Sequence, residues 1–413
     1  MAESIRLTRR QVSGLAFVLA AATAPNLFTS LAWAAKAYDT GATDTEIKIG
    51  QPVPYSGPVS FYAAIGKTTL GYFRMLNEEQ GGINGRKVTV ISLDDGYSPP
   101  KVVEVTRRMV EEDGVLAIFG ISGSASSASV QRYLAAKQVP QLFGFSGVHL
   151  FGDPKKSPWS VGFMPSYDFE GGTYGKYIRN SVKDPKVAIL YQNDDFGRAM
   201  RAGLRKGLGD MASKIVKEES YETTDPTVDS QIVSLAATGA NVLFLAAIPK
   251  PTSQAIRKCA QLGWNPLKLI QSGTASITAV LTPAGLENSI GVTTGKFLKD
   301  FGDPNWVDDA GTKTYATFMN KYVNGVNPSD ILAVLGYTVA QLMAQVLKQC
   351  GDELTRANVL KQACSIKGLH SDMLLPGITL NTEPDNRFPI RQMRMARFDG
   401  KHWEVFGDLL TEQ

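Results

Sequence analysis

Cysteine and histidine are scarce in this chain of 413 residues, which has three of each. No Cys-x-x-Cys pair occurs and the histidines are scattered, so we expect neither a Cys/His metal site nor another cofactor. Cys350 and Cys364 end two successive predicted helices. In an oxidising compartment they would form a disulfide, and otherwise they would be two buried thiols. Cys259 falls inside a predicted helix and is expected to be a small core residue.

A large excess of positive charge is also missing. The formal net charge is +4, and about half of it lies in the first 34 residues. No basic stripe alternates with aromatic residues in the remainder, and this argues against a nucleic-acid partner.

The usual catalytic motifs are absent from the sequence. A nucleophile elbow needs glycine two residues after the serine, and both Gly120–Ser124 and Gly144–Val148 lack it. No P-loop occurs, and no G-x-G-x-x-G opens a helix after the first predicted strand. The acidic pairs Asp94-Asp95 and Asp194-Asp195 each follow a strand, where capping of the next helix is the simpler interpretation. We therefore expect a protein that is not an enzyme.

The first 34 residues have the pattern of an export leader. Arg9-Arg10 precede an apolar run, Val12–Ala24, and Ala32-Trp33-Ala34 offers a small-x-small cleavage site. A run of about 13 residues is shorter than the roughly 20 that span a bilayer. The paired arginines resemble a twin-arginine signal. We expect cleavage near Ala34 and a periplasmic protein.

Short apolar strands alternate with helices in the remaining chain, first over 46–145 and again over 186–271. Such a rhythm predicts an α/β fold with parallel sheets covered by helices. Three helices are expected within 307–365, and strands within 390–406 are joined by a turn at Asp399-Gly400.

The restart of the rhythm, and a length of about 379 residues after the leader, predict two open-sheet Rossmann-like lobes joined by three crossovers. We assign 1–34 to the signal peptide and 44–166 plus 296–375 to an N-terminal lobe. Residues 167–295 plus 376–413 would form a C-terminal lobe. Ligands of open sheets bind at the carboxyl ends of the strands.

Two neighbouring strands lead into turns that are rich in small hydroxyl residues. Val115–Val130 runs from an apolar strand into a helix start that contains Ser122, Ser124 and Ser126. Unpaired backbone N–H groups at a helix start attract an anion, although ordinary helix capping by serine explains the pattern as well. Phe143–Val148 ends the next strand in the same way, so the pair predicts an anion cradle.

Aromatic residues are expected around the same edge of the sheets. An apolar pocket that accepts a ring needs several of them together, although each alone is usually a core residue. The candidates are Tyr62, Tyr97, Phe145, Tyr167, Phe169 and Trp264.

These segments together resemble the type I periplasmic solute-binding proteins of ABC transporters, in the branched-chain amino-acid-binding family. The resemblance rests on IKIGQPVPYSGPVSFYAAIG at 47–66, LAIFGISGSASSA at 116–128, VPQLFGFSG at 139–147 and YQNDDFGRAMRAGLRKGL at 191–208. It implies that the lobes close over a ligand like a Venus flytrap and then dock on ABC permease membrane subunits. The implied receptor is monomeric. In the first lobe the implied ligand contacts are Tyr62, Gly123, Ser124, Phe145, Ser146 and Gly147.

The second lobe departs from the amino-acid binders of that family. Such proteins offer an aromatic hydroxyl and a carboxylate to the α-ammonium of the ligand, whereas the matching stretches here are Ala246–Pro249 and Gln271–Thr274. Burying an ammonium without a counter-charge costs several kcal/mol. Contacts on this side are expected from Asp168, Phe169, Ile248 and Thr274, with Asp168 fitting a helix cap equally well.

The expected ligand is therefore a small carboxylate, aromatic or otherwise apolar, without an α-ammonium. A likeness to the aromatic-acid subgroup at 151–178 and 193–197 agrees with this. The alternatives are a branched-chain amino acid or amide, a sensor subunit that reports a ligand to a regulator, and an exported hydrolase using Ser124 or Ser146 with His149.

Overall fold

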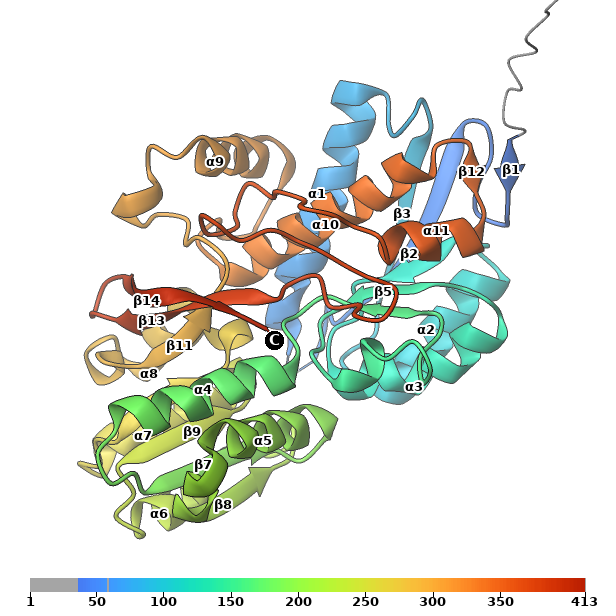
Figure 1. The fold of residues 1–413 in the computed structure, drawn as a ribbon. Helices are drawn as coiled ribbons and strands as arrows, with labels where there is room; N and C mark the ends of the chain where they lie inside the picture. The colour runs from blue at the N-terminus through green and yellow to red at the C-terminus, as the bar shows by residue number, and fades with distance from the viewer. Residues whose placement is uncertain (1–35, 58, 413) are drawn as a thin grey trace, which may run out of the picture. The chain divides into compact units, whose positions relative to one another are not determined.

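The computed structural model describes residues 36–57 and 59–412, which belong to one compact unit (Figure 1). The predicted twin-arginine leader and its cleavage site lie outside the described residues. Two large sheets organise the unit, as the α/β prediction requires. We call the part built on the five-stranded sheet the first lobe and the part built on the seven-stranded sheet the second lobe. The predicted lobe boundaries remain a prediction.

The first-lobe sheet is entirely parallel, in the order β3-β2-β4-β5-β6. Its central strands are apolar because helices cover both faces, and Val115–Phe119 is completely buried. The strands are β2 (Glu46–Val53), β3 (Lys87–Asp94), β4 (Ala117–Phe119), β5 (Gln141–Gly144) and β6 (Ser160–Gly162).

Six helices belong to this lobe. They are α1 (Ala63–Gln80), α2 (Pro99–Glu111), α3 (Ser124–Ala136), α9 (Ala310–Tyr322), α10 (Ile331–Cys350) and α11 (Arg356–Ala363). Among the described helices, only α10 is long and apolar enough to cross a membrane, but 83% of its most apolar window is buried. It packs on α1, where a Cβ on Gly336 would meet the Ile65 carbonyl oxygen at 2.6 Å. Its apolar sequence is explained by this position in the core.

The second-lobe sheet has the order β14-β13-β11-β10-β9-β7-β8. Strands β7 to β11 are parallel, and β13 and β14 complete the sheet as an antiparallel hairpin with its turn at the predicted Asp399-Gly400. The strands are β7 (Val187–Gln192), β8 (Ile215–Tyr221), β9 (Val242–Ala246), β10 (Leu267–Ile270), β11 (Thr293–Lys296), β13 (Gln392–Phe398) and β14 (Trp403–Thr411). The helices are α4 (Tyr167–Ser181), α5 (Asp195–Leu208), α6 (Asp229–Ala236), α7 (Pro249–Gln261) and the short α8 (Thr282–Ala284).

The chain passes between the two sheets three times, as predicted. It leaves the first sheet after β6, returns after β11 to form α9, α10 and α11, and enters the second sheet again at β13.

Helices α4 and α5 lie side by side in Figure 1 and approach closely because glycines face one another between them. A Cβ on Gly207 would lie 2.1 Å from the Gly172 carbonyl oxygen, and one on Gly203 would lie 2.3 Å from that of Tyr167. Gly172 itself has room for a methyl group, since the nearest atom would be 3.8 Å away. Close packing at these glycines therefore sets the spacing of α4 and α5.

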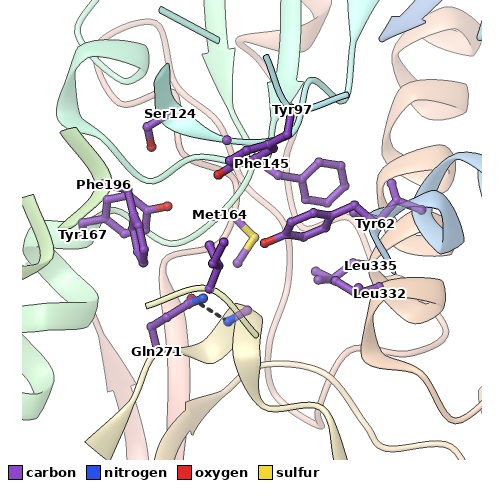
Figure 2. Close-up of a pocket in the computed structure, with 14 residues that line it drawn as sticks. Tyr62, Tyr97, Ser124, Phe145, Met164, Tyr167, Phe196, Gln271, Leu332 and Leu335 are labelled. Atoms are coloured by element: carbon purple, nitrogen blue, oxygen red, sulfur yellow. Dashed lines mark hydrogen bonds between the residues drawn. The ribbon is translucent and has the colours of Figure 1, made fainter. Parts of the chain in front are cut away.

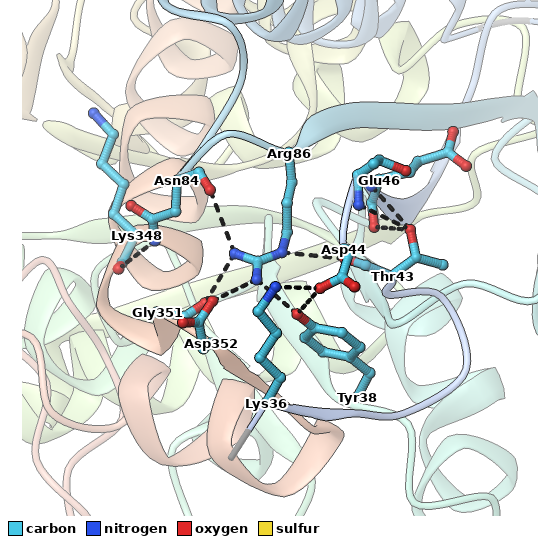
Figure 3. A network of polar contacts seen from close by, with 11 residues as sticks. Lys36, Tyr38, Thr43, Asp44, Glu46, Asn84, Arg86, Lys348, Gly351 and Asp352 are labelled. Carbon is cyan, nitrogen blue, oxygen red and sulfur yellow. Dashed lines mark hydrogen bonds and ion pairs between the residues drawn. The ribbon is translucent and has the colours of Figure 1, made fainter. Parts of the chain in front are cut away.

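The start of the described chain is held by an arginine at the amino ends of β2 and β3 (Figure 3). Residues Ala37–Tyr38 form β1, which pairs in parallel with β12 (Glu353–Leu354). The side chain of Arg86, which is 3% exposed, donates to Asp352 Oδ1 at 2.5 Å and to the Tyr38 hydroxyl at 2.8 Å. This network therefore lies at the opposite ends of the strands from the turns predicted to bind ligand.

The predicted disulfide between Cys350 and Cys364 is not formed. In the described part of the chain both cysteines are unpaired, and each is buried in the first-lobe core. Burial raises the pKa of the Cys350 thiol to about 12 and also raises that of Cys364. The two side chains serve as small apolar core residues, a common role of buried cysteine. Cys259 is likewise buried, in the second-lobe core, as expected.

Candidate functional site

A cavity lies between the carboxyl ends of the two sheets (Figure 2). From the first lobe it is lined by Tyr62, Ile65, Tyr97, Gly123, Ser124, Phe145, Met164, Leu332 and Leu335. From the second lobe it is lined by Tyr167, Phe196, Ile248, Gln271 and Gly273. Most of these residues directly follow a strand, which is where an open α/β sheet places its ligand.

The start of α3 forms the polar part of the first-lobe wall. Its N-cap is Gly123, at φ 92°, and no side chain caps this helix. By contrast, Ser166 accepts from the Phe169 N–H at the start of α4, and Asp194 accepts from the Gly197 N–H at the start of α5. The first N–H groups of a helix have no partner within it, so the start of α3 offers donors to an anion.

Two serines meet beside this helix start, as the cradle prediction requires. The Ser124 and Ser146 hydroxyls are 2.7 Å apart, and both residues are buried. Ser146 also accepts from the Val148 N–H at 3.3 Å. Ser124 therefore faces the cavity, while Ser146 supports it from behind.

Tyrosine rings make up much of the remaining surface. Tyr62 stacks on Tyr97 with ring centroids 6.0 Å apart and planes 13° apart, and Tyr167 contacts Phe196 at 5.2 Å between centroids. Figure 2 shows the hydroxyl groups of the three tyrosines pointing into the space between the lobes. Burial raises the pKa of all three phenols, so each remains a neutral hydrogen-bonding group at neutral pH.

The second-lobe wall is uncharged. The Gln271 side-chain oxygen accepts from the Gly273 N–H at 2.8 Å, which closes the turn after β10. Ile248 follows β9, and its N–H donates to the Tyr221 hydroxyl at 3.0 Å. Among the described residues that line the cavity, none carries an acidic or basic side chain.

A buried carboxyl group lies behind this wall. Glu170, in the first turn of α4, is completely buried, and its Oε1 accepts from the Ser272 N–H at 2.5 Å and from the Tyr174 hydroxyl at 2.8 Å. The Tyr174 hydroxyl in turn accepts from the Gly295 N–H of β11 at 2.9 Å. Burial raises the pKa of Glu170. The carboxyl group thus joins α4, the Gln271–Thr274 turn and β11.

The structure brings Tyr62, Gly123, Ser124, Phe145 and Ile248 together around the cavity. The remaining predicted residues do not line it, although Ser146 and Gly147 lie directly behind it, in contact with Ser124 and Tyr167.

Thr274 is buried and donates to the Gln271 carbonyl oxygen at 2.8 Å, while Gly147 accepts from the Tyr167 N–H at 2.8 Å. Asp168 and Phe169 line a separate hollow beside the C-terminal strand. The cap of α4 is Ser166, and Asp168 belongs to its first turn, so the capping alternative for Asp168 is wrong.

Sequence reasoning did not include several lining residues among its site predictions. Met164 and Phe196 follow β6 and β7, so the rule that ligands bind at strand ends would have found them. Tyr97 and Tyr167 appear only among the six aromatic residues expected near the pocket, and Gln271 appears only as part of a turn without an acid. Nothing in the sequence distinguishes Ile65, Leu332 and Leu335 from core residues of long apolar helices.

The arrangement does not support a serine hydrolase. His149 is largely exposed and its Nε2 is 4.0 Å from Asp153, while Ser146 is paired with Ser124. Within residues 36–57 and 59–412, no group of three or more His, Cys, Asp or Glu side chains is placed to hold a metal ion.

Comparison with known proteins agrees with this geometry. The model of a family described as periplasmic binding protein matches residues 46–402. The Leu/Ile/Val-binding protein homolog 1 of Brucella abortus is 23% identical over 351 residues, which cover 84% of this chain and 91% of that protein.

Two solved structures show the same fold. A branched-chain amino acid ABC transporter protein from Thermus thermophilus with bound valine aligns with a TM-score of 0.78 at 14% identity, over 89% of this chain and 97% of that one. A fatty acid ABC transporter substrate-binding protein from Thermomonospora curvata aligns with a TM-score of 0.74 at 19% identity, over 92% and 95%.

Proposed function

Because the chain belongs to the periplasmic binding protein family, of the Leu/Ile/Val-binding type, we propose that it binds a small apolar or aromatic carboxylate without an α-ammonium. It would deliver this ligand to the membrane subunits of an ABC importer. The relatives are binding proteins rather than enzymes, and the family location is extracytoplasmic.

The observation that carries the proposal is the contrast between the two sides of the cavity. The uncapped start of α3 and the Ser124 hydroxyl offer donors for a carboxylate. The described lining residues include no carboxylate that could balance an ammonium. Glu170 lies behind the Ser272 N–H, which already occupies its Oε1. A ligand ammonium would lose its hydration without gaining a counter-charge, a loss of several kcal/mol.

The fold itself admits both kinds of ligand. One structure of this fold contains valine, and another is named for fatty acid transport. The apolar walls formed by Phe145, Phe196, Leu332 and Leu335 suit an aliphatic chain or an aromatic ring equally well. The experiment should therefore compare ligands that differ only in the α-ammonium.

Pairs of ligands that differ only in the α-ammonium give the sharpest test. We would compare 4-methylpentanoate with leucine, and 3-phenylpropanoate with phenylalanine, by thermal shift and calorimetry. A ligand that binds the folded state raises the melting temperature by mass action. We expect each desamino acid to bind at least ten-fold more tightly than its amino acid. Leucine binding as tightly as 4-methylpentanoate would refute the proposed ligand class and favour a branched-chain amino acid.

A further inference from the structure

Tyr97 contributes a large ring to the cavity from an unusual backbone conformation. It lies two residues after Asp95, just beyond the end of β3, and its φ is 59°, in the left-handed region that side chains with a Cβ rarely adopt. Such strain persists only where the surrounding structure holds it, and it is often found at binding sites. The contacts of Tyr97 show what holds it.

Asp95 holds the backbone of Tyr97. This side chain is completely buried, and its Oδ1 accepts from the Tyr97 N–H at 2.8 Å. Its Oδ2 has no partner among the described residues, and burial raises the pKa of the group to about 6. The neighbouring Asp94 has a different role, because it accepts from the backbone of Tyr55 and Ser56 and pairs with Lys101.

Gly123 provides the space for the ring. A Cβ at this position would lie 2.6 Å from the Tyr97 ring and 2.7 Å from its hydroxyl oxygen. Any residue other than glycine would therefore displace the tyrosine, quite apart from the positive φ of Gly123. The ring also stacks on Tyr62.

The ring reaches from the first lobe to the second. Tyr97 packs against the hydrophobic core of the second lobe, and its hydroxyl lies close to Gln192, the last residue of β7. Figure 2 shows this hydroxyl in the space between the lobes. A ligand enclosed by the two lobes would therefore meet the Tyr97 ring on the first-lobe side.

We propose that Tyr97 is a specificity-determining residue of the cavity, and that Asp95 is a positioning residue that holds Tyr97 in its strained conformation over Gly123. The proposal rests on the proposed function only in taking this cavity as the ligand site. It does not depend on which small molecule binds there.

A ligand-free double-mutant comparison tests the positioning role. We would measure the urea midpoint of Asp95→Ala in the wild-type background and in the Tyr97→Gly background. Glycine adopts a positive φ without strain, so the fall caused by Asp95→Ala should be at least halved when residue 97 is glycine. Gln138→Gly is the matched control background, because Gln138 also has a positive φ of 52° but is exposed just after α3. In this background Asp95→Ala should lower the urea midpoint as much as it does in the wild type. Equal falls in all three backgrounds would overturn the positioning role.

Calorimetry with 4-methylpentanoate and leucine tests the role in binding. With whichever of the two probes the wild type binds, we expect about ten-fold weaker binding for Asp95→Ala and for Tyr97→Ala. The double variant should be no weaker than the weaker single variant, and Asp95→Asn, which keeps the acceptor oxygen, should recover most of the loss. If leucine alone binds, the proposed ligand class is wrong, but the affinities of the single and double variants for leucine still test the roles of Tyr97 and Asp95. Losses that multiply in the double variant, or binding unchanged in both single variants, would overturn it.

Discussion

The two walls of the cavity are built in different ways. The first-lobe wall takes its candidate anion-binding groups from the backbone at the start of α3 and from Ser124, which lie within one strand–turn–helix unit. The second-lobe wall presents Tyr167, Phe196 and Gln271, whose positions depend on contacts between elements far apart in sequence. Local structure therefore makes the anion site, while tertiary packing makes the opposing face.

The supports behind the second wall explain this dependence. The glycine contacts between α4 and α5 set the spacing of the two helices whose first turns carry Tyr167 and Phe196. Glu170 then ties α4 to the turn that carries Gln271. A change in either support should disturb the second-lobe wall more than the first-lobe wall, and substitutions can test that difference.

The largest effect is expected from Gly207→Ala. The new methyl group would lie 2.1 Å from the Gly172 carbonyl oxygen, so α4 and α5 must separate, at a cost of about 3 kcal/mol in the free energy of unfolding. Gly172→Ala is the control in the same helix pair, because its methyl group has room and alanine favours a helix by about 0.5–1 kcal/mol over glycine. Urea denaturation of both variants measures the difference. Equal stability of the two would show that the glycine contact does not set the helix spacing.

Glu170→Ala should have the next largest effect. It leaves the buried Ser272 N–H and Tyr174 hydroxyl without their acceptor, which should lower the free energy of unfolding by about 2 to 3 kcal/mol. Glu170→Gln keeps an acceptor oxygen and should retain most of the stability. Ligand affinity should fall with Glu170→Ala as well, because the Gln271 turn loses its support. If the glutamine variant unfolds as easily as the alanine variant, the acceptor role is not the cause.

Asp95 of the first lobe should make the stability of the protein depend on pH. Its folded pKa of about 6 exceeds the ordinary aspartate value of about 3.9, so between these values the folded state binds a proton that the unfolded chain has released. Stability should therefore fall by about 2 kcal/mol as pH rises from about 4 to 7.

Asp95→Asn should remove this fall. Asp94 has a pKa lowered by Lys101, Ser56 and Gly96 against the opposing effect of burial, so its contribution is lost only below about pH 4, outside this window. Denaturation midpoints measured at half-unit steps of pH would show the difference. Parallel pH profiles for wild type and Asp95→Asn would contradict the prediction.

The smallest effect is expected from Ser124→Ala in the first wall. Loss of one hydroxyl beside a bound carboxylate should weaken binding by about 1 to 2 kcal/mol. Loss of the buried hydrogen bond to Ser146 should also lower the free energy of unfolding by about 1 kcal/mol. Ser129→Ala is the control on the same helix, because Ser129 is exposed and its hydroxyl donates to the Ser126 carbonyl oxygen. Calorimetry with the desamino acid that binds most tightly measures the affinities of both variants. Equal affinities would remove Ser124 from the binding site.

Much of the first wall was predictable because its signals are local. Strand, glycine turn and serine-rich helix start are contiguous from Val115 to Val130, and the rule that ligands bind at the carboxyl ends of strands locates them. Phe145 was found in the same way, whereas Tyr62 came from the group of aromatic residues and from the resemblance to the family. Asp168 and Phe169 were placed on the wrong surface, because their sequence position at the start of α4 does not reveal which side of that helix faces the cavity.

The alternation of strands and helices along the chain, the three passages between the lobes and the strand ends where the cavity lies could all be predicted from the sequence. Those features follow from periodicity and turn residues within short segments. Packing between distant elements decides that Leu332 and Leu335 line the cavity and that Glu170 supports the opposite wall. It also decides that Cys350 and Cys364 are two unpaired core residues. Each of these depends on which faces of distant elements meet, and a local pattern of apolar and polar residues does not contain that information.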